Sequence, residues 1–365
     1  MPVELPVKPA NRKRSLPAQM HPRLESTASS VIDKIPVSMV LHLAKPYLAG
    51  ETAEQAVALA HQLFSKDSFT STLDILGEDM ESDATCDASV EAYKQLAERI
   101  AANPLAVNEP HRQLTISLKP SMFATAAPGA QGNGHSEDVL MKAYERIKEV
   151  TAFARERGIR VTLEAEDHRW TDFHLNTYRE LIESGLTNLG TVIQTRLFRT
   201  QKDLELFDQR MRVRLVIGIY NEPAAIAHTD KAEMKRLLVD YAGVLLERGV
   251  YVEIATHDID CIHDFFERVA LPGNISPDRF EFQFLHGVPR DQLQKGLVDG
   301  SYCTAQSFPD ADPAVLESLR ASGFTVRKYL PFGQSRVAGA YCRRRLKENP
   351  NMVSYGIKNF FGWQS

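Results

Sequence analysis

Two basic side chains lie within β-rich, apolar stretches of the chain, where a charge is costly to bury. Lys119 ends one such stretch and Arg214 lies inside another. A buried cation requires an anionic partner, and the acidic pair Glu164 and Glu166 in a third stretch could provide one as an internal ion pair. A bound anionic ligand would account for the same residues. The sequence therefore indicates either an internal charge network or a site for an anion.

A run of three arginines near the C-terminus could also bind a small anion. Residues 329–349 read YLPFGQSRVAGAYCRRRLKEN, in which Pro331 and Gly333 end a strand and open a helix. On that helix the arginines at 343–345 point about 100° apart, but their long side chains can converge on one carboxylate. A solvated helix face is the other interpretation of the same run.

These residues need a scaffold, and the chain supplies a regular one. Short β-rich runs alternate with amphipathic stretches from residue 69 onward. The eight predicted strands are residues 69–77, 114–120, 160–166, 189–197, 213–221, 251–258, 280–288 and 325–333. The eight predicted helices are residues 88–103, 138–157, 171–185, 199–210, 232–248, 259–269, 290–298 and 335–348, with a further helix at 313–321. Strands that are mostly apolar on both faces, each followed by a helix, predict an α/β fold of the (β/α)8 TIM-like type.

The barrel prediction also says where the chemistry should lie. In such barrels the working residues stand at the C-terminal ends of the strands and in the loops that follow. A nucleotide-binding doubly wound sheet fits less well, because the chain has neither a GxGxxG nor a GxxxxGK[ST] motif.

The chain divides into four predicted segments. Residues 1–36 are rich in proline and carry basic residues at 12–14, which is typical of a disordered arm. Residues 37–68 have apolar positions at helical spacing and form a helical prelude. Residues 69–350 form the barrel, and 351–365 are a C-terminal tail.

Composition excludes several classes of protein. The 365 residues carry a net charge of −4, so no overall positive field would hold the chain to nucleic acid or to an anionic membrane. No run approaches the roughly 18 apolar residues of a membrane-spanning helix. The four cysteines are far apart and include no CxxC pair, which argues against a zinc ribbon and favours a reducing, cytoplasmic compartment.

Several ordered motifs together resemble the FAD-dependent proline dehydrogenase (proline oxidase) family. The C-terminal segment fits the family's Y-x-P-x-G strand and Y-x-x-R-R-L-x-E-N helix, and Glu164 and Glu166 stand where the family has an acidic pair. The other blocks are LDILGE (73–78), SLKPS (117–121), VIQ (192–194), RLV-x-G-x-Y (214–220), ATHD (255–258) and EFQFLHG (281–287). The resemblance covers roughly residues 69–350 and implies that the last helix lies over the active site.

The resemblance implies a set of residues that bind L-proline. They are Lys119, Glu164, Tyr220, Tyr329, Tyr341, Arg344 and Arg345. Arg344 and Arg345 would pair with the proline carboxylate, helped by Lys119. The tyrosines would pack against or close to the pyrrolidine ring, and Glu164 would accept the amine proton or organise the site.

The resemblance also implies a non-covalent FAD at the barrel mouth. The residues that would contact it are Gln194, Arg214, Thr256, His257 and Glu348. Gln194 would meet the pyrimidine edge of the flavin, Arg214 would lie near N5, and Glu348 would reach the adenosine ribose. Hydride would pass from proline C5 to flavin N5, giving 1-pyrroline-5-carboxylate. The electrons would go on to a quinone or other acceptor, so a cytoplasmic protein that contacts a membrane surface peripherally is expected.

Three positions depart from the family pattern. Ile217 replaces a basic residue, Ile219 replaces an alanine, and Glu164 replaces a shorter aspartate. The first two bear on flavin or phosphate contacts, and the third on the shape of the substrate pocket.

Two other functions stay open at this point. A metal-dependent barrel hydrolase or isomerase could use Glu164, His168, His257 and His286 as ligands, although no HxH or HExxH spacing occurs and no metal site is predicted. A non-catalytic barrel that acts as a binding partner is the other alternative. Sequence does not choose between a catabolic and a biosynthetic role for a proline dehydrogenase.

Overall fold

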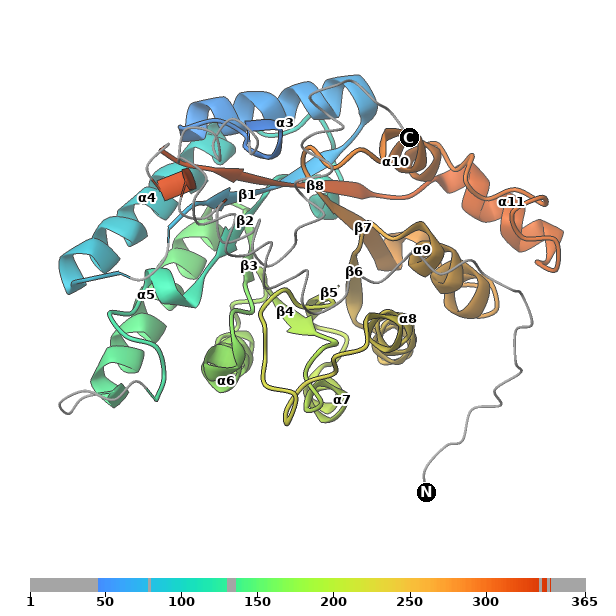
Figure 1. Ribbon diagram of the computed structural model, residues 1–365. Helices are drawn as coiled ribbons and strands as arrows, with labels where there is room; N and C mark the ends of the chain where they lie inside the picture. Colours follow the sequence, from blue (N-terminus) through green and yellow to red (C-terminus); the bar gives the residue numbers. More distant parts are fainter. Residues whose placement is uncertain (1–44, 78–79, 130–135, 335–336, 340–341, 343–365) are drawn as a thin grey trace.

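Eight parallel strands close into a barrel in the computed structural model, which describes residues 45–77, 80–129, 136–334, 337–339 and 342 (Figure 1). Neighbouring strands pair in chain order, and β8 pairs with β1 to complete the ring. The strands are β1 Thr70–Ile75, β2 Thr115–Leu118, β3 Arg160–Leu163, β4 Leu189–Gln194, β5 Arg212–Val216, β6 Tyr251–Ala255, β7 Phe280–Leu285 and β8 Val326–Phe332. The predicted α/β barrel is confirmed.

Helices surround the barrel in the order that the sequence predicts. They are α3 Ala53–Asp67, α4 Asp83–Ala102, α5 Ser136–Glu156, α6 Thr171–Glu183, α7 Thr200–Asp203, α8 Lys231–Glu247, α9 Ile259–Phe265, α10 Asp291–Val298 and α11 Pro313–Ser322. Short 3-10 turns are η1 Lys45–Tyr47, η2 Pro110–Arg112, η3 Pro120–Met122, η4 His168–Trp170, η5 Leu204–Leu206 and η7 Pro277–Arg279, and a π-helical turn, η6 Phe266–Ala270, extends α9.

Side-chain caps explain why several helices begin where they do. Asp230 accepts a hydrogen bond from the backbone N–H of Ala232 at 2.9 Å and opens α8. Asp258 does the same for Cys261 at 3.0 Å and opens α9 directly after β6. These caps satisfy backbone donors that the first helical turn leaves unpaired.

The predicted helix at 199–210 is wrong beyond its first turns. It consists of α7 and η5 only, and Phe207 is already in an extended conformation. The Phe207 ring is buried and lies 6.2 Å from the ring of Tyr178. Burying this ring in the core therefore takes precedence over continuing the helix.

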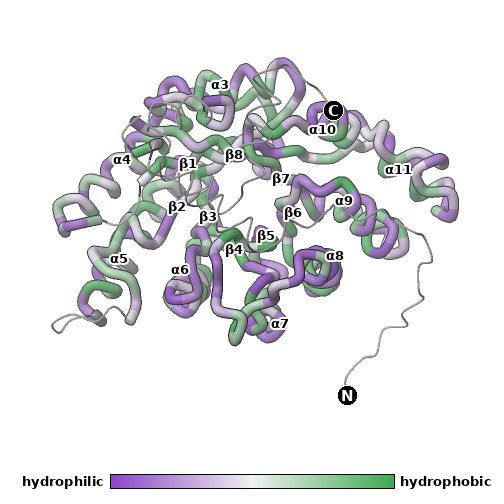
Figure 2. The backbone as a smooth tube through the Cα atoms, viewed as in Figure 1, coloured by the Kyte–Doolittle hydropathy of each residue, from purple (hydrophilic) through white to green (hydrophobic). Residues whose placement is uncertain are grey.

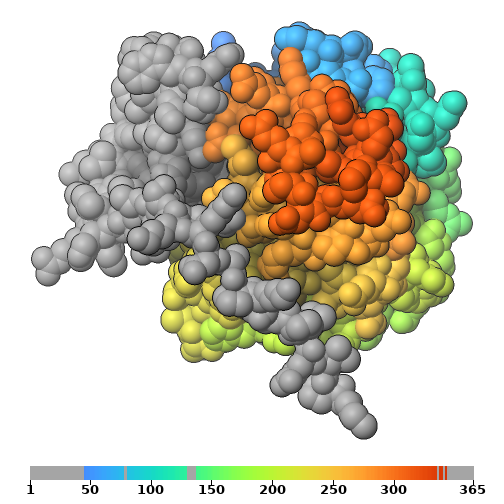
Figure 3. Space-filling view, turned by 90° about the vertical axis from the view of Figure 1, so that its right-hand side faces the viewer, coloured from blue at the N-terminus to red at the C-terminus, as the bar shows by residue number. Residues whose placement is uncertain are grey.

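The apolar core lies between the barrel and its helices. Outward-facing strand residues such as Ile116, Val213 and Ile254 are fully buried there. The helices show mixed hydrophobic and hydrophilic turns, as expected for elements with one buried face (Figure 2). The additional segment between α10 and β8, which includes α11, spreads over the outside of the molecule (Figure 3). Among the described residues, no helix is both long and apolar enough to cross a membrane.

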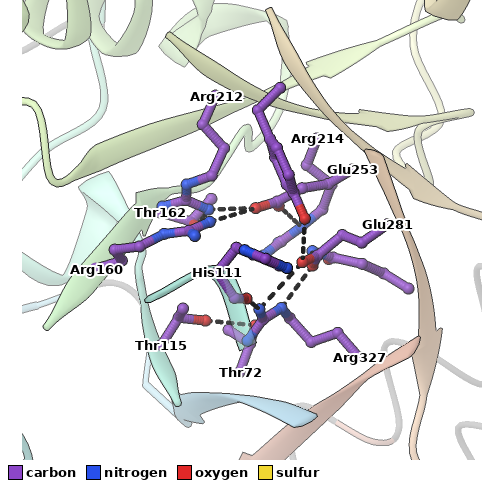
Figure 4. Close-up of polar contacts among 12 residues, drawn as sticks. Thr72, His111, Thr115, Arg160, Thr162, Arg212, Arg214, Glu253, Glu281 and Arg327 are labelled. Atoms are coloured by element: carbon purple, nitrogen blue, oxygen red, sulfur yellow. Dashed lines mark hydrogen bonds and ion pairs between the residues drawn. The ribbon is translucent and has the colours of Figure 1, made fainter. Parts of the chain in front are cut away.

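The inside of the barrel is polar, in contrast to the prediction of strands that are apolar on both faces. The Thr72 and Thr115 hydroxyls lie 2.7 Å apart, and Glu253 and Arg327 are buried inside the ring. Ion pairs between strands, drawn in Figure 4, offset the cost of burying these charges. The interior is therefore a charge network rather than a layer of branched apolar side chains.

Part of the predicted organisation lies outside the described residues. This part includes the arm 1–36, residues 37–44 of the helical prelude and the tail 351–365. Of the predicted last helix, only residues 337–339 and 342 are described, and they are helical.

Candidate active site

Four strands bring a cluster of polar side chains together at the barrel mouth. Arg214 on β5 donates from Nη1 to Oε1 of Glu164, which follows β3, at 2.5 Å. The phenol of Tyr329 on β8 lies 2.9 Å from the Ser117 hydroxyl and 3.4 Å from Glu164 Oε1, and Ser117 also donates to Glu164. The Tyr329 ring centre is 5.3 Å from the Arg214 guanidinium. Three residues that the sequence assigned separately to substrate and cofactor thus contact one another.

Arg214 is fully charged in this cluster. Burial acts to lower its pKa, but the neighbouring carboxylates of Glu164 and Glu253 outweigh this effect and raise the pKa above its usual value. Its Nη2 is buried and makes no hydrogen bond within the part of the chain that the structure describes. The mouth therefore holds a permanently charged guanidinium whose Nη2 group can still donate a hydrogen bond.

Lys119 is also buried, but its partner differs from the one suggested by sequence. Its Nζ pairs with Asp74 on β1 and donates to the Ile75 carbonyl at 3.1 Å. Glu166 instead accepts from the Ser121 backbone N–H at 2.8 Å and from the Ser121 hydroxyl at 2.6 Å. The predicted internal ion pair therefore forms between Glu164 and Arg214, whereas Lys119 pairs with Asp74.

Gln194 stands at the end of β4 with one polar atom unused. Its Nε2 donates to the Glu166 carbonyl at 2.8 Å, whereas its buried Oε1 has no hydrogen bond within the described residues. Gly218 has φ +96° and packs so closely that a Cβ there would lie 2.5 Å from this Oε1. The backbone conformation therefore favours glycine, and a Cβ at this position would push the Gln194 amide away.

Thr256 and His257 follow β6 and border an open cavity of about 460 Å³. The cavity is lined by Ile217, Thr256, His257, Asp258, Ile259, Asp260 and Arg290. His257 Nε2 accepts from the Leu285 backbone N–H at 3.4 Å, so the proton of the neutral ring is on Nδ1, which is buried without a partner in the described structure. Burial, together with Lys328 and Arg290, lowers the pKa of His257 to about 4, so the ring is neutral at pH 7.

The other predicted site residues are placed in part. Tyr220 is half-buried in the loop after β5, where its carbonyl accepts a hydrogen bond from Arg196. Tyr341, Arg344, Arg345 and Glu348 lie outside the described residues.

The residues considered for a metal site are dispersed. Glu164 lies in the barrel mouth, whereas His168 Nδ1 pairs with Glu222 Oε2 at 2.5 Å. His257 and His286 follow β6 and β7. No group of three or more His, Cys, Asp or Glu side chains among the described residues could hold a metal ion.

Some residues of the mouth were not singled out by sequence. Ser117 and Arg290 lie near the C-terminal end of a strand or in the loop after it, which is the one signal that points to them. Glu253 was missed because it lies deeper in the barrel, within β6.

The unused polar atoms at the mouth fit a polar heterocycle. Gln194 Oε1 offers an acceptor, and Arg214 Nη2 and His257 Nδ1 offer donors, from three consecutive strand ends. A flavin presents both N–H and carbonyl groups that such atoms can match. Fold and site together define a barrel whose mouth offers unused donor and acceptor atoms at the C-terminal end of its strands, as in the barrel enzymes that bind a polar cofactor there.

Comparison with known proteins agrees with this class. Residues 58–355 match the family model described as Proline dehydrogenase. The chain is 33% identical over 333 residues to the proline dehydrogenase of Deinococcus radiodurans, covering 90% of this chain and 93% of that one. It is 27% identical over 316 residues to proline dehydrogenase 1 of Bacillus subtilis (strain 168), covering 86% and 89%.

Solved structures share the fold. The PutA protein from Bdellovibrio bacteriovorus, inactivated by N-propargylglycine, aligns with a TM-score of 0.68 at 23% identity, over 83% of this chain and 32% of that one. The chain belongs to the proline dehydrogenase family. It is an FAD-dependent enzyme that oxidises L-proline to 1-pyrroline-5-carboxylate.

Proposed function

We propose that the polar cluster at the barrel mouth is the place where L-proline is bound and oxidised. The observation that carries this assignment is the contact among Arg214, Glu164, Tyr329 and Ser117, in which a buried cation, a carboxylate and a phenol face one mouth. When bound, FAD supplies the acceptor for the hydride of proline C5. The protein's own side chains bind the substrate, orient it and hold the charges in place.

The substrate carboxylate is assigned to Arg344 and Arg345, with the charge of Lys119 nearby. The resemblance in the C-terminal helix supports this assignment, since guanidinium groups bind carboxylates by paired hydrogen bonds. Tyr329, Tyr341 and Tyr220 supply packing around the pyrrolidine ring.

Glu164 is assigned an organising role rather than that of the proton acceptor. Its Oε1 already accepts from Arg214, Ser117 and Tyr329. Protonating Glu164 would also weaken its ion pair with the buried Arg214, so we assign the amine proton to water before the hydride leaves.

The cofactor is assigned to the mouth between β4 and β6. Gln194, Arg214, Thr256 and His257 contact it there, and Glu348 reaches its ribose. The unused donor and acceptor atoms of Gln194, Arg214 and His257 support this placement.

The electron acceptor is assigned as a membrane quinone, reached by peripheral contact from the cytoplasm. Phe198 and Ile226 are partly exposed apolar residues on adjacent loops at the mouth, joined by a hydrogen bond from Phe198 N to the Ile226 carbonyl at 3.0 Å. They could enter a lipid interface together with the basic residues at 12–14. Cys86, Cys261 and Cys303 are buried and form no disulfide, which fits a reducing compartment. The segments 1–36, 37–68, 69–350 and 351–365 are kept as the proposed domain organisation.

Turnover with a soluble quinone tests the proposed function. The purified holoenzyme is given L-proline, and the cyclic imine product is trapped with an aromatic amino-aldehyde. We expect quinone-dependent product from L-proline and none from D-proline. Product formation that is unchanged in Arg214→Met would contradict the placement of the site, and no product from L-proline would contradict the function.

A further inference from the structure

A fully buried carboxylate lies directly beneath the cation of the barrel mouth. Glu253 on β6 has no exposed surface and faces the barrel interior (Figure 4). Its Oε1 pairs with Arg212 and lies 4.0 Å from Nη2 of Arg160, while its Oε2 lies 3.4 Å from Nε of Arg214. The same side chain therefore joins the floor of the barrel to the residue at its mouth.

Arg214 is consequently held between two carboxylates. Glu164 binds Nη1 from above at 2.5 Å, and Glu253 faces Nε from below. A guanidinium is planar and rigid, so two fixed edges determine where its third nitrogen points. The third nitrogen, Nη2, makes no hydrogen bond within the described residues, and Nε meets Glu253 as an ion pair without a hydrogen bond.

The charge balance of the interior gives Glu253 a second constraint. Four arginines, at 160, 212, 214 and 327, share three glutamates, at 164, 253 and 281, so the network carries one excess positive charge. Burial acts to raise the pKa of Glu253, but the surrounding arginines outweigh it and lower the pKa to about 2. Glu253 is therefore ionised at neutral pH. Without this carboxylate, Arg214 and Arg212 would lose the counter-ion that they share in the buried interior.

We propose that Glu253 is a positioning residue for the reaction: it fixes the Nε edge of Arg214 so that Nη2 is presented to the negative charge that develops when the hydride is transferred. The inference rests on the proposed function, in which Arg214 faces the flavin. A donor fixed before the reaction stabilises developing charge without a cost of reorganisation, so its orientation affects the transition state more than substrate binding.

The variants Glu253→Gln and Glu281→Gln test this role as a matched pair. Glu281 is the register neighbour of Glu253 on β7, is equally buried, and pairs with Arg327 on β8. Each variant loses one interior carboxylate, but only Glu253 contacts Arg214. Three quantities are measured on holoenzyme: the rate of flavin reduction by L-proline, the Kd of tetrahydrofuran-2-carboxylate, and the midpoint potential of the bound flavin.

We expect Glu253→Gln to reduce flavin at least tenfold more slowly than Glu281→Gln, with the Kd of the carboxylate changed less than twofold. The sign of the change in midpoint potential distinguishes a loss of Arg214 orientation from a simple loss of negative charge. Loss of Arg214 orientation lowers the midpoint potential, because the reduced, negatively charged flavin is less stabilised. Simple loss of a negative charge raises it. A rise, no change, or equal behaviour of the two variants would overturn the proposal.

Glu253→Gln leaves Arg212 without its counter-ion, so the double variant Glu253→Gln/Arg212→Gln is measured as well. It preserves the net charge of the interior, and we expect the same slow reduction and lowered potential; normal values would refute the positioning role. The wild-type measurement distinguishes failure of the proposed function from failure of the positioning role of Glu253. If L-proline does not reduce the wild-type flavin, the proposed function fails, whereas normal reduction in both wild type and the double variant refutes only the role of Glu253.

Discussion

Replacing Lys328 by methionine should stabilise the protein, and the gain should shrink as the pH rises. Lys328 is 3% exposed on β8, with its side chain directed away from the barrel interior. Its Nζ donates to the amide oxygen of Gln294 and lies 4.8 Å from the centre of the Phe69 ring. No carboxylate forms a salt bridge with it within the described residues. The native state therefore holds a lysine whose charge is poorly compensated.

The magnitude follows from the pKa of this lysine. Burial lowers it to about 8, and in the unfolded chain it is about 10.4. Between these two values the unfolded state binds more protons than the folded state, so the free energy of unfolding rises with pH. Below the folded pKa the charged lysine costs about 3 kcal/mol of stability, and by about pH 9.5 roughly 2 kcal/mol of that cost is recovered.

Urea denaturation of wild type and Lys328→Met at about pH 7 and about pH 9.5 measures this effect. The hydrogen bond to Gln294 is lost in the variant at both pH values. Its loss therefore does not change the pH dependence of the difference in unfolding free energy between the two proteins. We expect the difference in unfolding free energy between the two proteins to change by about 2 kcal/mol in favour of wild type over this interval. A difference that is independent of pH would refute the account of Lys328 as a buried, poorly compensated charge.

Three further predictions concern the site. Arg344→Ala or Arg345→Ala should raise the KM for L-proline by one to two orders of magnitude with FAD retained, since each removes a charge-assisted hydrogen bond of roughly 1.5–3 kcal/mol; an equal effect of the control Arg343→Ala in steady-state kinetics would argue against this pairing. Wild type should prefer L-proline over trans-4-hydroxy-L-proline by at least about tenfold in kcat/KM, roughly 1.4 kcal/mol. The Tyr329 phenol is held at the mouth by a hydrogen bond, so it leaves no room for an added hydroxyl on the pyrrolidine ring. Tyr329→Ser should narrow that preference, and an unchanged ratio would remove Tyr329 from the pocket. Gly218→Ala should weaken FAD binding in a flavin-fluorescence titration, because the added Cβ would come within 2.5 Å of the amide oxygen at the end of β4; wild-type affinity would show that this loop can adjust.

The strands could be predicted because each is a short run of residues that favour strands, bounded by turns. All eight runs contain the observed strands or overlap them closely, as for 160–166 and Arg160–Leu163. The helix at 199–210 could not be bounded in this way, because its end is set by a tertiary contact of Phe207. Local pattern carries no information about such a contact.

The identities of several site residues could be predicted, but not their partners. Barrel topology brings the ends of the strands together, so Arg214 and Glu164 were both expected at the mouth. Whether Lys119 would pair with an acidic residue on β3 or with Asp74 on β1 depends on strand register. That register is fixed by the closed barrel as a whole and cannot be read from either segment alone.

Anaerobic titration of the purified holoenzyme with L-proline measures whether the substrate reduces the bound flavin at the barrel mouth. We expect L-proline to bleach the visible absorbance of the flavin, and Arg214→Met to slow this bleaching by at least tenfold while retaining the cofactor. A flavin that stays oxidised in wild type at saturating L-proline, or that is reduced as fast in Arg214→Met, would contradict this expectation.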